Sequence, residues 1–490
     1  MAMTESNTSK AIKGMSSQTL VTIILGVVEV VSFSLMSRLL SREDFGYYAA
    51  ITAVVTVFAC LSDAGIGSAI IQKKEASQSF INNAFSLGLW FGAAASLLLF
   101  SFAGVIARLV ADSSMTVPLR IMSVTLLLNC LNSINISIMY KRLQFLRVGL
   151  INLISSVVTT VVAVYLAWKG FGYYAIITKA VLTSVICVVL SYLMAHTKYR
   201  IVVEMQTYKE IFCFSGWLMA SSIFRNVAAQ IDRLTMPRLL SVASLGAYNR
   251  PKDFLHQVST RLNSIFDTAL FPVLSGIQDD KKRLGNSYRQ SLYAINVFAM
   301  FLAFSVIVNS ELIIRIFFGS EWLSLKALTQ VLALVLVFNI DGRLADCYLR
   351  SLGKTRDQFN FRIVETITNL SAVLIGYHWD VMGVAVAMLI ATSSIKICKI
   401  LFVTRYMDLS KWDSIKIIVS SWKFMIVLLP LSITTYRLLP NTWGGNIVLL
   451  IIYLALSGTL FLCFPSLVGK HYKDAIYTRA IAFIKIKIHK

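Results

Sequence analysis

Four segments of this sequence place charged side chains among residues that are otherwise apolar. The first holds Ser222, Arg225 and Asp232, whose spacing puts all three on one face of a helix. Arg225 lies near the middle of its segment, too deep to reach the edge easily. A guanidinium in such a place can bind phosphate or carboxylate through paired hydrogen bonds. Two interpretations stay open: Arg225 binds an anionic ligand, or a neighbouring carboxylate neutralises it and the pair fixes helix packing.

The next segment carries an unbroken polar stripe along one helical face. Lipid would not tolerate such a stripe, so we expect it to face water or another helix. Its members are Arg250, Asp253, Gln257, Arg261, Ser264 and Thr268. Asp253 lies between two arginines and could partly neutralise both, which leaves a purely structural stripe as the alternative.

Two later segments repeat this pattern. Their polar faces are Asn339, Arg343, Asp346 and Arg350 in one segment and Arg362, Glu365 and Asn369 in the next. Asp346 stands at ion-pair spacing from Arg343 on one side and from Arg350 on the other. The arginines therefore either line a cavity that takes an anion or form a ladder of ion pairs along a helix.

Deep ionisable groups are few in the first 200 residues. Glu29 is the deep carboxylate there, on the face that Ser32 shares, and Lys179 is the deepest base. Glu29 and Asp232 are our candidates for binding a coupling proton or cation. Alternatively, Glu29 pairs with Arg225 or simply stays protonated.

The elements that must carry these side chains are membrane-spanning helices. The chain has 490 residues, of which 57% are hydrophobic and 14% charged, with a mean hydropathy of +0.71. A soluble protein carries about 25% charged residues. Apolar runs of about 20 residues, long enough to cross a bilayer, recur from end to end. The sequence therefore predicts an all-α polytopic membrane protein of about 14 transmembrane helices.

An internal repeat divides these helices into two lobes. MSRLLS at 36–41, followed by Gly46 and Tyr48, returns as MPRLLS at 236–241, followed by Gly246 and Tyr248. Because an even number of spans separates the copies, both lobes have the same orientation, as in parallel-repeat transporters. We predict a six-helix lobe over 1–200, a second over 201–408, two additional transmembrane helices over 409–466 and a basic tail over 467–490.

The net charge of +22 is concentrated in short loops beside the spans. With the N-terminus inside, about 25 basic residues face the cytoplasm and about 10 face outward, so both termini are predicted to be cytoplasmic. Anionic membrane lipids account for this charge, and a nucleic-acid partner is not needed.

Enzymatic and metal chemistry find no support in the sequence. The connections between spans are too short for an embedded nucleotide-binding domain, and there is no GxxxxGK[ST] phosphate loop. The five histidines are scattered, the seven cysteines form no CxxC pair, and neither GxSxG nor HExxH occurs. We therefore expect no catalytic site, no metal and no cofactor.

Several stretches carry a resemblance to a known family. They are RLLS at 38–41, DFG at 44–46, DAGIGSAIIQK at 63–73, GAYN at 246–249, FPVLSGIQDD at 271–280, and Phe318-Gly319 with Trp322. In these residues the chain resembles the Wzx-type polysaccharide-transporter branch of the multidrug/oligosaccharidyl-lipid/polysaccharide (MOP) exporter superfamily. It is most similar there to colanic acid and teichuronic acid exporters, and the resemblance spans most of the chain.

The resemblance implies a flippase in the bacterial cytoplasmic membrane that works by alternating access around a cationic lumen, coupled to an ion gradient. Its implied cargo is an undecaprenyl-diphosphate-linked oligosaccharide, moved to the outer leaflet for O-antigen, capsule or exopolysaccharide assembly. A polysaccharide polymerase and a chain-length regulator are the implied protein partners. The lumen cations that would bind the diphosphate and sugars are Arg225, Arg250, Arg261, Arg343, Arg350, Arg362 and Lys179.

Other functions remain as alternatives. An ion-coupled drug antiporter should have an acidic, aromatic cavity, whereas this one is rich in arginine. A lipid II flippase would share the diphosphate chemistry. A membrane polymerase or ligase would need a large outer loop with catalytic residues, which the sequence lacks, and a non-transporting scaffold would not explain the polar stripes.

Overall fold

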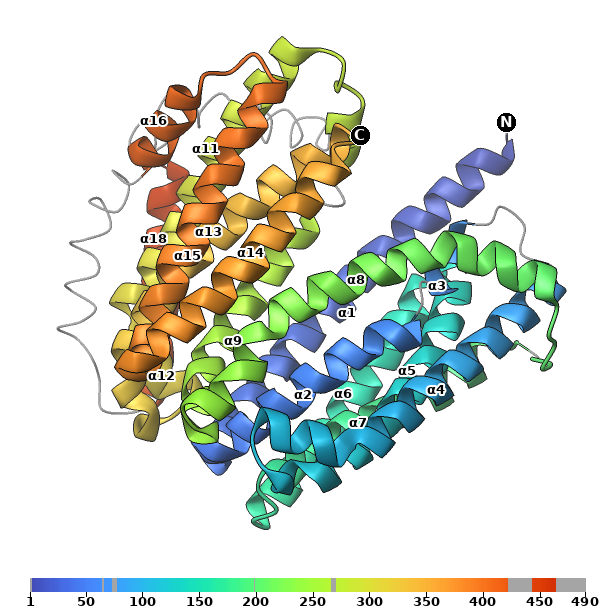
Figure 1. Ribbon diagram of the computed structural model, residues 1–490. Helices are drawn as coiled ribbons and strands as arrows, with labels where there is room; N and C mark the ends of the chain where they lie inside the picture. The colour runs from blue at the N-terminus through green and yellow to red at the C-terminus, as the bar shows by residue number, and fades with distance from the viewer. Residues whose placement is uncertain are drawn as a thin grey trace. The chain divides into compact units, whose positions relative to one another are not determined.

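A computed structural model describes residues 2–63, 66–72, 77–197, 199–265, 270–421 and 443–463, and these ranges contain helices and no strands. The chain forms two compact units, Met1–Gly246 and Ala247–Lys490 (Figure 1). The predicted all-α fold is thereby confirmed. The predicted basic tail at 467–490 lies outside the described residues.

The first unit is built from long helices. They are α1 (Ala2–Leu39), α2 (Arg42–Asp63), α3 (Ile66–Gln72), α4 (Gln78–Val110), the short η1 (Ser113–Met115), α5 (Thr116–Lys141), α6 (Phe145–Trp168), α7 (Tyr173–Ala195) and α8 (Met205–Leu239). α5 packs on α4 and α7, and α6 packs on α1 and α7. α8 packs on α2, α3 and α4. The lobe boundary near residue 200 stays a prediction about the two repeats.

The second unit is arranged around the largely buried helix α13 (Lys326–Ser351). Helix α9 (Val242–Ile265) begins in the first unit and continues into the second at Ala247. The other elements of the second unit are α10 (Phe271–Ser275), α11 (Lys281–Val308), α12 (Ser310–Phe317), η3 (Ser320–Leu325), α14 (Thr355–Gly376), η4 (Tyr377–Trp379), α15 (Asp380–Val403), η5 (Thr404–Tyr406), α16 (Lys411–Ser421) and α18 (Trp443–Cys463). α13 lies between α11 and α15, and α14 packs on α15 (Figure 1). The core joins α11 and α13 where the rings of Tyr288 and Tyr348 meet edge to face, 4.8 Å apart.

Eight stretches of the described helices are long and apolar enough to cross a membrane, and one of them runs through both α14 and α15. Large apolar side chains remain exposed along them, such as Leu109 at 71% and Val161 at 65%. Exposure of this kind suits contact with lipid and would be a liability in water. The protein is therefore a multi-pass membrane protein.

The repeated motif begins helices in both copies. Ser41 and Asp44 form a reciprocal capping box at the start of α2, with backbone-to-side-chain distances of 2.9 and 3.1 Å. The other oxygen of Asp44 accepts a hydrogen bond of 2.8 Å from the backbone of Tyr173, the first residue of α7. In the second copy, Ser241 caps the backbone N–H of Ser244 at 3.0 Å. The motif is thus a helix-start signal.

The glycines of the two motif copies meet in the first unit. A Cβ added to Gly46 would lie 1.9 Å from the carbonyl oxygen of Val242. A Cβ added to Gly246 would lie 1.8 Å from the carbonyl oxygen of Arg42. Only glycine permits two backbones to approach so closely. The contact is reciprocal, because each glycine touches the start of the helix that carries the other, and we call it the glycine crossing.

The connector between α7 and α8 follows the polar N-terminal part of α4. The backbone N–H of Val202 donates to Ser86 at 2.9 Å, and that of Glu204 donates to Asn83 at 2.9 Å. Tyr199 stacks on Phe85 of α4, with ring centroids 4.3 Å apart. The buried polar side chains of α4 therefore hold the connector in place.

Candidate functional site: a charged cluster on three helices

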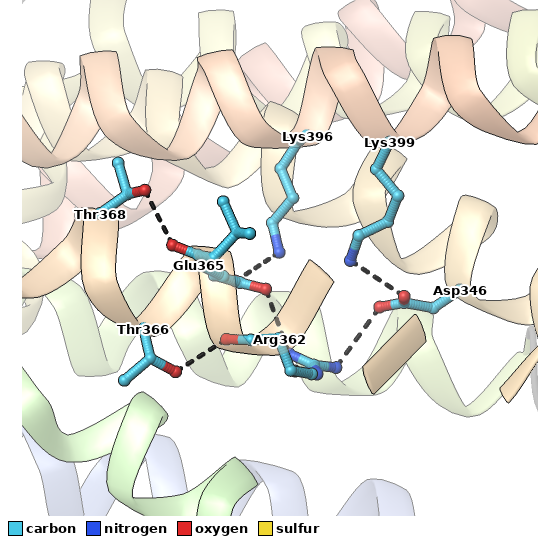
Figure 2. A network of polar contacts seen from close by, with 8 residues as sticks. Asp346, Arg362, Glu365, Thr366, Thr368, Lys396 and Lys399 are labelled. Carbon is cyan, nitrogen blue, oxygen red and sulfur yellow. Dashed lines mark hydrogen bonds and ion pairs between the residues drawn. The ribbon is translucent and has the colours of Figure 1, made fainter. Parts of the chain in front are cut away.

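A cluster of five charged side chains lies where α13, α14 and α15 meet in the second unit. Its members are Asp346 on α13, Arg362 and Glu365 on α14, and Lys396 and Lys399 on α15. The amines of the two lysines point from α15 toward the two carboxylates, and Arg362 lies on the far side of both (Figure 2). We call these residues the charged cluster.

Each carboxylate in the cluster contacts one lysine and Arg362. Lys399 Nζ lies 2.9 Å from Asp346 Oδ1, and Lys396 Nζ lies 2.5 Å from Glu365 Oε1. The guanidinium of Arg362 is 3.4 Å from Asp346 and 3.4 Å from Glu365. The side chain of Lys399 is fully buried, whereas that of Arg362 is 26% exposed. Arg362 is thus the most accessible and most weakly held member.

The cluster has one positive charge in excess, because it combines three cations with two carboxylates. Buried charges are tolerated only when they are paired, and removing one partner of such a pair costs about 3–5 kcal/mol. The lysines hold the carboxylates at the shorter distances. Arg362 can therefore turn to another anion while both carboxylates keep a cation.

The position of Lys396 depends on Gly342 of α13. A Cβ added to Gly342 would lie 2.4 Å from Lys396 Cδ and 3.1 Å from Cε. Because Gly342 has no side chain, the methylenes of Lys396 pass close to the backbone of α13 on their way to Glu365. The backbone of α13 therefore takes part in building the cluster.

Replacing Gly342 with alanine is expected to displace Lys396 from Glu365 and to destabilise the protein by about 1–3 kcal/mol, the usual cost of overpacking. The midpoint of thermal unfolding in detergent measures this effect. The matched control is Gly444→Ala on α18, where an added Cβ has no atom within 4 Å.

A double-mutant cycle then isolates the cause. In a Lys396→Ala background the lysine methylenes are gone, so Gly342→Ala should lose most of its effect. An equal loss of stability in both backgrounds would contradict the role assigned to this contact.

α14 presents its charges on one side and apolar residues on the other. Arg362 and Glu365 face α13 and α15 within the cluster. Val364, Ile367 and Ile375 are exposed at 51%, 60% and 58%. This is the reverse of a soluble amphipathic helix, because here the apolar face suits lipid. The two cluster charges of α14 lie on the side that packs against α13 and α15.

Of the seven cations predicted from the sequence, the cluster contains Arg362. Arg343 and Arg350 lie on α13 outside it, and the guanidinium of Arg350 stands 5.7 Å from the centre of the Phe271 ring. The ion pairs of Asp346 lead to α14 and α15. Of the two alternatives for this helix, the ladder of ion pairs along α13 therefore does not hold for Asp346, because charges on the packed neighbours reach the carboxylate. That Arg343 and Arg350 line a cavity for an anion stays a prediction.

The other predicted residues lie elsewhere. In the first unit Lys179 donates a hydrogen bond to Ser32 of α1, Glu29 is half-buried on α1, and Asp232 is buried on α8 at 1% exposure. Arg250 is buried on α9 at 8% exposure. Arg225 on α8 and Arg261 on α9 have side chains that lie outside the described part of the chain. Their roles as ligands stay predictions.

Sequence reasoning missed Lys396 and Lys399. They stand three residues apart in a strongly apolar segment, which puts them on one helical face. A lysine inside a span is costly and normally has a partner. That signal was sufficient to find both residues, although it does not identify their partners.

Comparisons with known proteins place the chain among polysaccharide-related membrane proteins. Residues 35–327 match a family described as "Polysaccharide biosynthesis protein". The succinoglycan biosynthesis transport protein ExoT of Rhizobium meliloti (strain 1021) is 25% identical over 356 residues, 71% of either chain. The lipopolysaccharide biosynthesis protein WzxC of Escherichia coli (strain K12) is 22% identical over 372 residues, 75% of either chain.

A solved structure shares the fold. Lipid II flippase MurJ in an inward closed conformation is similar to this chain with a TM-score of 0.69 and 16% sequence identity. The similarity covers 92% of this chain and 99% of that chain.

Proposed function

The chain belongs to the polysaccharide biosynthesis protein family, and from this premise we propose that it is a flippase for lipid-linked oligosaccharides. Its cargo is an undecaprenyl-diphosphate-linked repeat unit, which it moves from the cytoplasmic to the outer leaflet of the bacterial cytoplasmic membrane. The product serves the assembly of O-antigen, capsule or exopolysaccharide. Both termini face the cytoplasm, and a polysaccharide polymerase and a chain-length regulator act on the product afterwards. The membership also agrees with the Wzx-type resemblance of the sequence.

The observation that carries this proposal is the excess positive charge of the charged cluster. A diphosphate that bears sugars crosses hydrocarbon very slowly, because burying its charges without partners costs many kcal/mol. Arginine binds phosphate oxygens through two parallel hydrogen bonds, which lysine cannot do. Arg362, held at 3.4 Å by each of its two carboxylates, is the cation that supplies this contact.

The cargo binds by exchange of partners. As a phosphate approaches, the guanidinium of Arg362 turns from Asp346 and Glu365 to the phosphate oxygens. Lys399 and Lys396 keep the carboxylates neutralised, so no buried charge is left alone. When the cargo leaves, the guanidinium of Arg362 returns to Asp346 and Glu365. No other ion is then needed to neutralise the site. Alternating access of the two repeats carries the bound diphosphate across the membrane.

The proposal is tested by translocation of a fluorescent undecaprenyl-diphosphate-oligosaccharide in proteoliposomes. We expect transfer between leaflets with the wild-type protein and none in protein-free vesicles. Parallel assays with lipid II and with a lipophilic cationic drug separate the alternatives. Transport of the drug but not of the oligosaccharide would show that the protein is a drug exporter. Transport of lipid II alone would show that its cargo is lipid II.

Arg225→Ala is expected to abolish export while the protein stays folded and inserted, because its mid-span position makes it a second candidate for binding the diphosphate. The same leaflet assay measures the effect. A monodisperse size-exclusion profile of the protein in detergent shows that the variant is folded. Export at the wild-type rate would reduce Arg225 to a packing residue.

A further inference from the structure

A second buried carboxylate on α13 has surroundings unlike those of Asp346. Asp341 is 1% exposed, and its Oδ2 accepts a hydrogen bond from the amide of Asn296 on α11, which is itself fully buried. The other oxygen, Oδ1, has no hydrogen-bond partner among the described residues. Among the described residues, the carboxyl group is therefore held by one neutral amide at Oδ2, and Oδ1 accepts no hydrogen bond.

The cations near Asp341 are committed to other groups. On α15, Lys396 runs past the neighbouring Gly342 to Glu365, and Lys399 binds Asp346. On α11, the hydroxyl of Tyr288 donates to the carbonyl of Ile400 at 3.1 Å. The remaining charged groups on the elements packed against this helix, or on α13 itself, are Lys281, Lys282, Arg283 and Arg289 of α11, Arg356, Asp357 and Arg362 of α14, Asp380 of α15, Glu311 and Arg315 of α12, Glu321 of η3, and Lys326, Arg343 and Arg350 of α13. Among the described ion pairs, none joins one of these cations to Asp341.

Two carboxyl groups five residues apart on α13 thus have opposite electrostatic surroundings. Asp346 contacts two cations, which stabilise its charged form. Asp341 contacts none in the described part of the chain. Burying an ionised carboxylate without a cation costs so much that such a group holds a proton instead. When the surroundings stabilise the charged form of one carboxyl group and the protonated form of another, the two groups can take different roles in a mechanism.

We propose that Asp341 carries the proton that couples transport to a proton gradient. This inference rests on the proposed flippase function and extends it to energy coupling. The protonated, neutral form suits the packed α11–α13 interface, whereas the ionised form requires water. Loss of the proton is therefore linked to opening of this interface, which is how a gradient drives a change of conformation.

The site suits a proton better than a metal ion. Hard cations bind several oxygen ligands at once, and here the polar oxygens come from Asp341 and Asn296. No group of three histidine, cysteine or acidic side chains that could hold a metal occurs among the described residues. A proton needs only the one free oxygen of Asp341.

Infrared spectroscopy of the purified protein tests the site directly. The wild type should show the carbonyl band of a protonated carboxylic acid at neutral pH. Asp341→Asn should lack the band, and the matched control Asp279→Asn, which removes an exposed carboxylate, should keep it. Persistence of the band in Asp341→Asn would overturn the proposal. If that variant fails to fold, Asn296→Val replaces it: loss of the donor should make the band persist to higher pH, and an unchanged titration would overturn the proposal.

Transport assays then separate the site from the proposed function. A proton gradient should accelerate translocation by the wild type several-fold and have no effect on Asp341→Asn. Full acceleration in that variant would exclude Asp341 as the coupling group. If the wild type moves no lipid-linked oligosaccharide at all, the flippase function fails, whereas the infrared result still decides whether Asp341 holds a proton.

Discussion

Arg362→Ala is expected to slow translocation of undecaprenyl-diphosphate-oligosaccharide by about 30-fold or more. Losing one partner of a desolvated charge pair costs about 2–5 kcal/mol, and each 1.4 kcal/mol is a factor of about ten. The fold should survive, because Lys399 and Lys396 still neutralise Asp346 and Glu365. The leaflet assay gives the rate, and thermal unfolding in detergent shows that the protein is intact.

Two further variants make this test specific. Arg362→Lys keeps the charge but loses the planar fork, so we expect an intermediate rate. Arg356→Ala on the same helix removes an exposed arginine that lies outside the charged cluster, and it should transport at the wild-type rate. A wild-type rate for Arg362→Ala would mean that the cluster only fixes the packing of α13, α14 and α15.

Alanine at Gly46 or Gly246 is expected to prevent stable folding. The added Cβ would lie 1.9 or 1.8 Å from a backbone carbonyl oxygen, and a backbone cannot move aside as a flexible side chain can. Overpacking normally costs about 1–3 kcal/mol, and a clash with main chain belongs at or above the upper end of that range. Fluorescence-detected size exclusion should show little monodisperse protein for either variant.

The control for the glycine crossing is Gly104→Ala on α4, where the added Cβ meets only Thr116 at 3.8 Å. That substitution should be neutral or stabilising by about 0.4–1 kcal/mol, because alanine restricts the unfolded chain. If Gly46→Ala and Gly246→Ala behave like Gly104→Ala, the close approach is not a requirement of the native fold.

The helical membrane fold could be predicted because its determinants are local. An apolar run of about 20 residues identifies a span wherever its neighbours lie. The repeat was equally visible, since RLLS with a following glycine and tyrosine occurs twice, 200 residues apart. The physical role of the repeat could not be predicted, because the capping box and the glycine crossing depend on which helix starts meet in space.

The charged cluster was only half predictable for the same reason. Arg362 stood out because an arginine inside a span demands a partner. Asp346, however, binds Lys399 across 53 residues of sequence, and periodicity along one helix cannot indicate which helices pack together. Asp341 was missed because its importance depends on the nearby lysines of α15 binding other carboxylates, which is a property of the packing.

The way in which α4 holds the connector determines where natural variation can accumulate. Asn82, Asn83 and Ser86 bind the backbone N–H groups of residues 200, 202 and 204, while the side chains of Ile201 and Val203 are exposed at 63% and 62%. We therefore expect evolutionary constraint to fall on the amides and hydroxyl of α4 rather than on the exposed side chains of Ile201 and Val203, which can be replaced without changing the path of the chain.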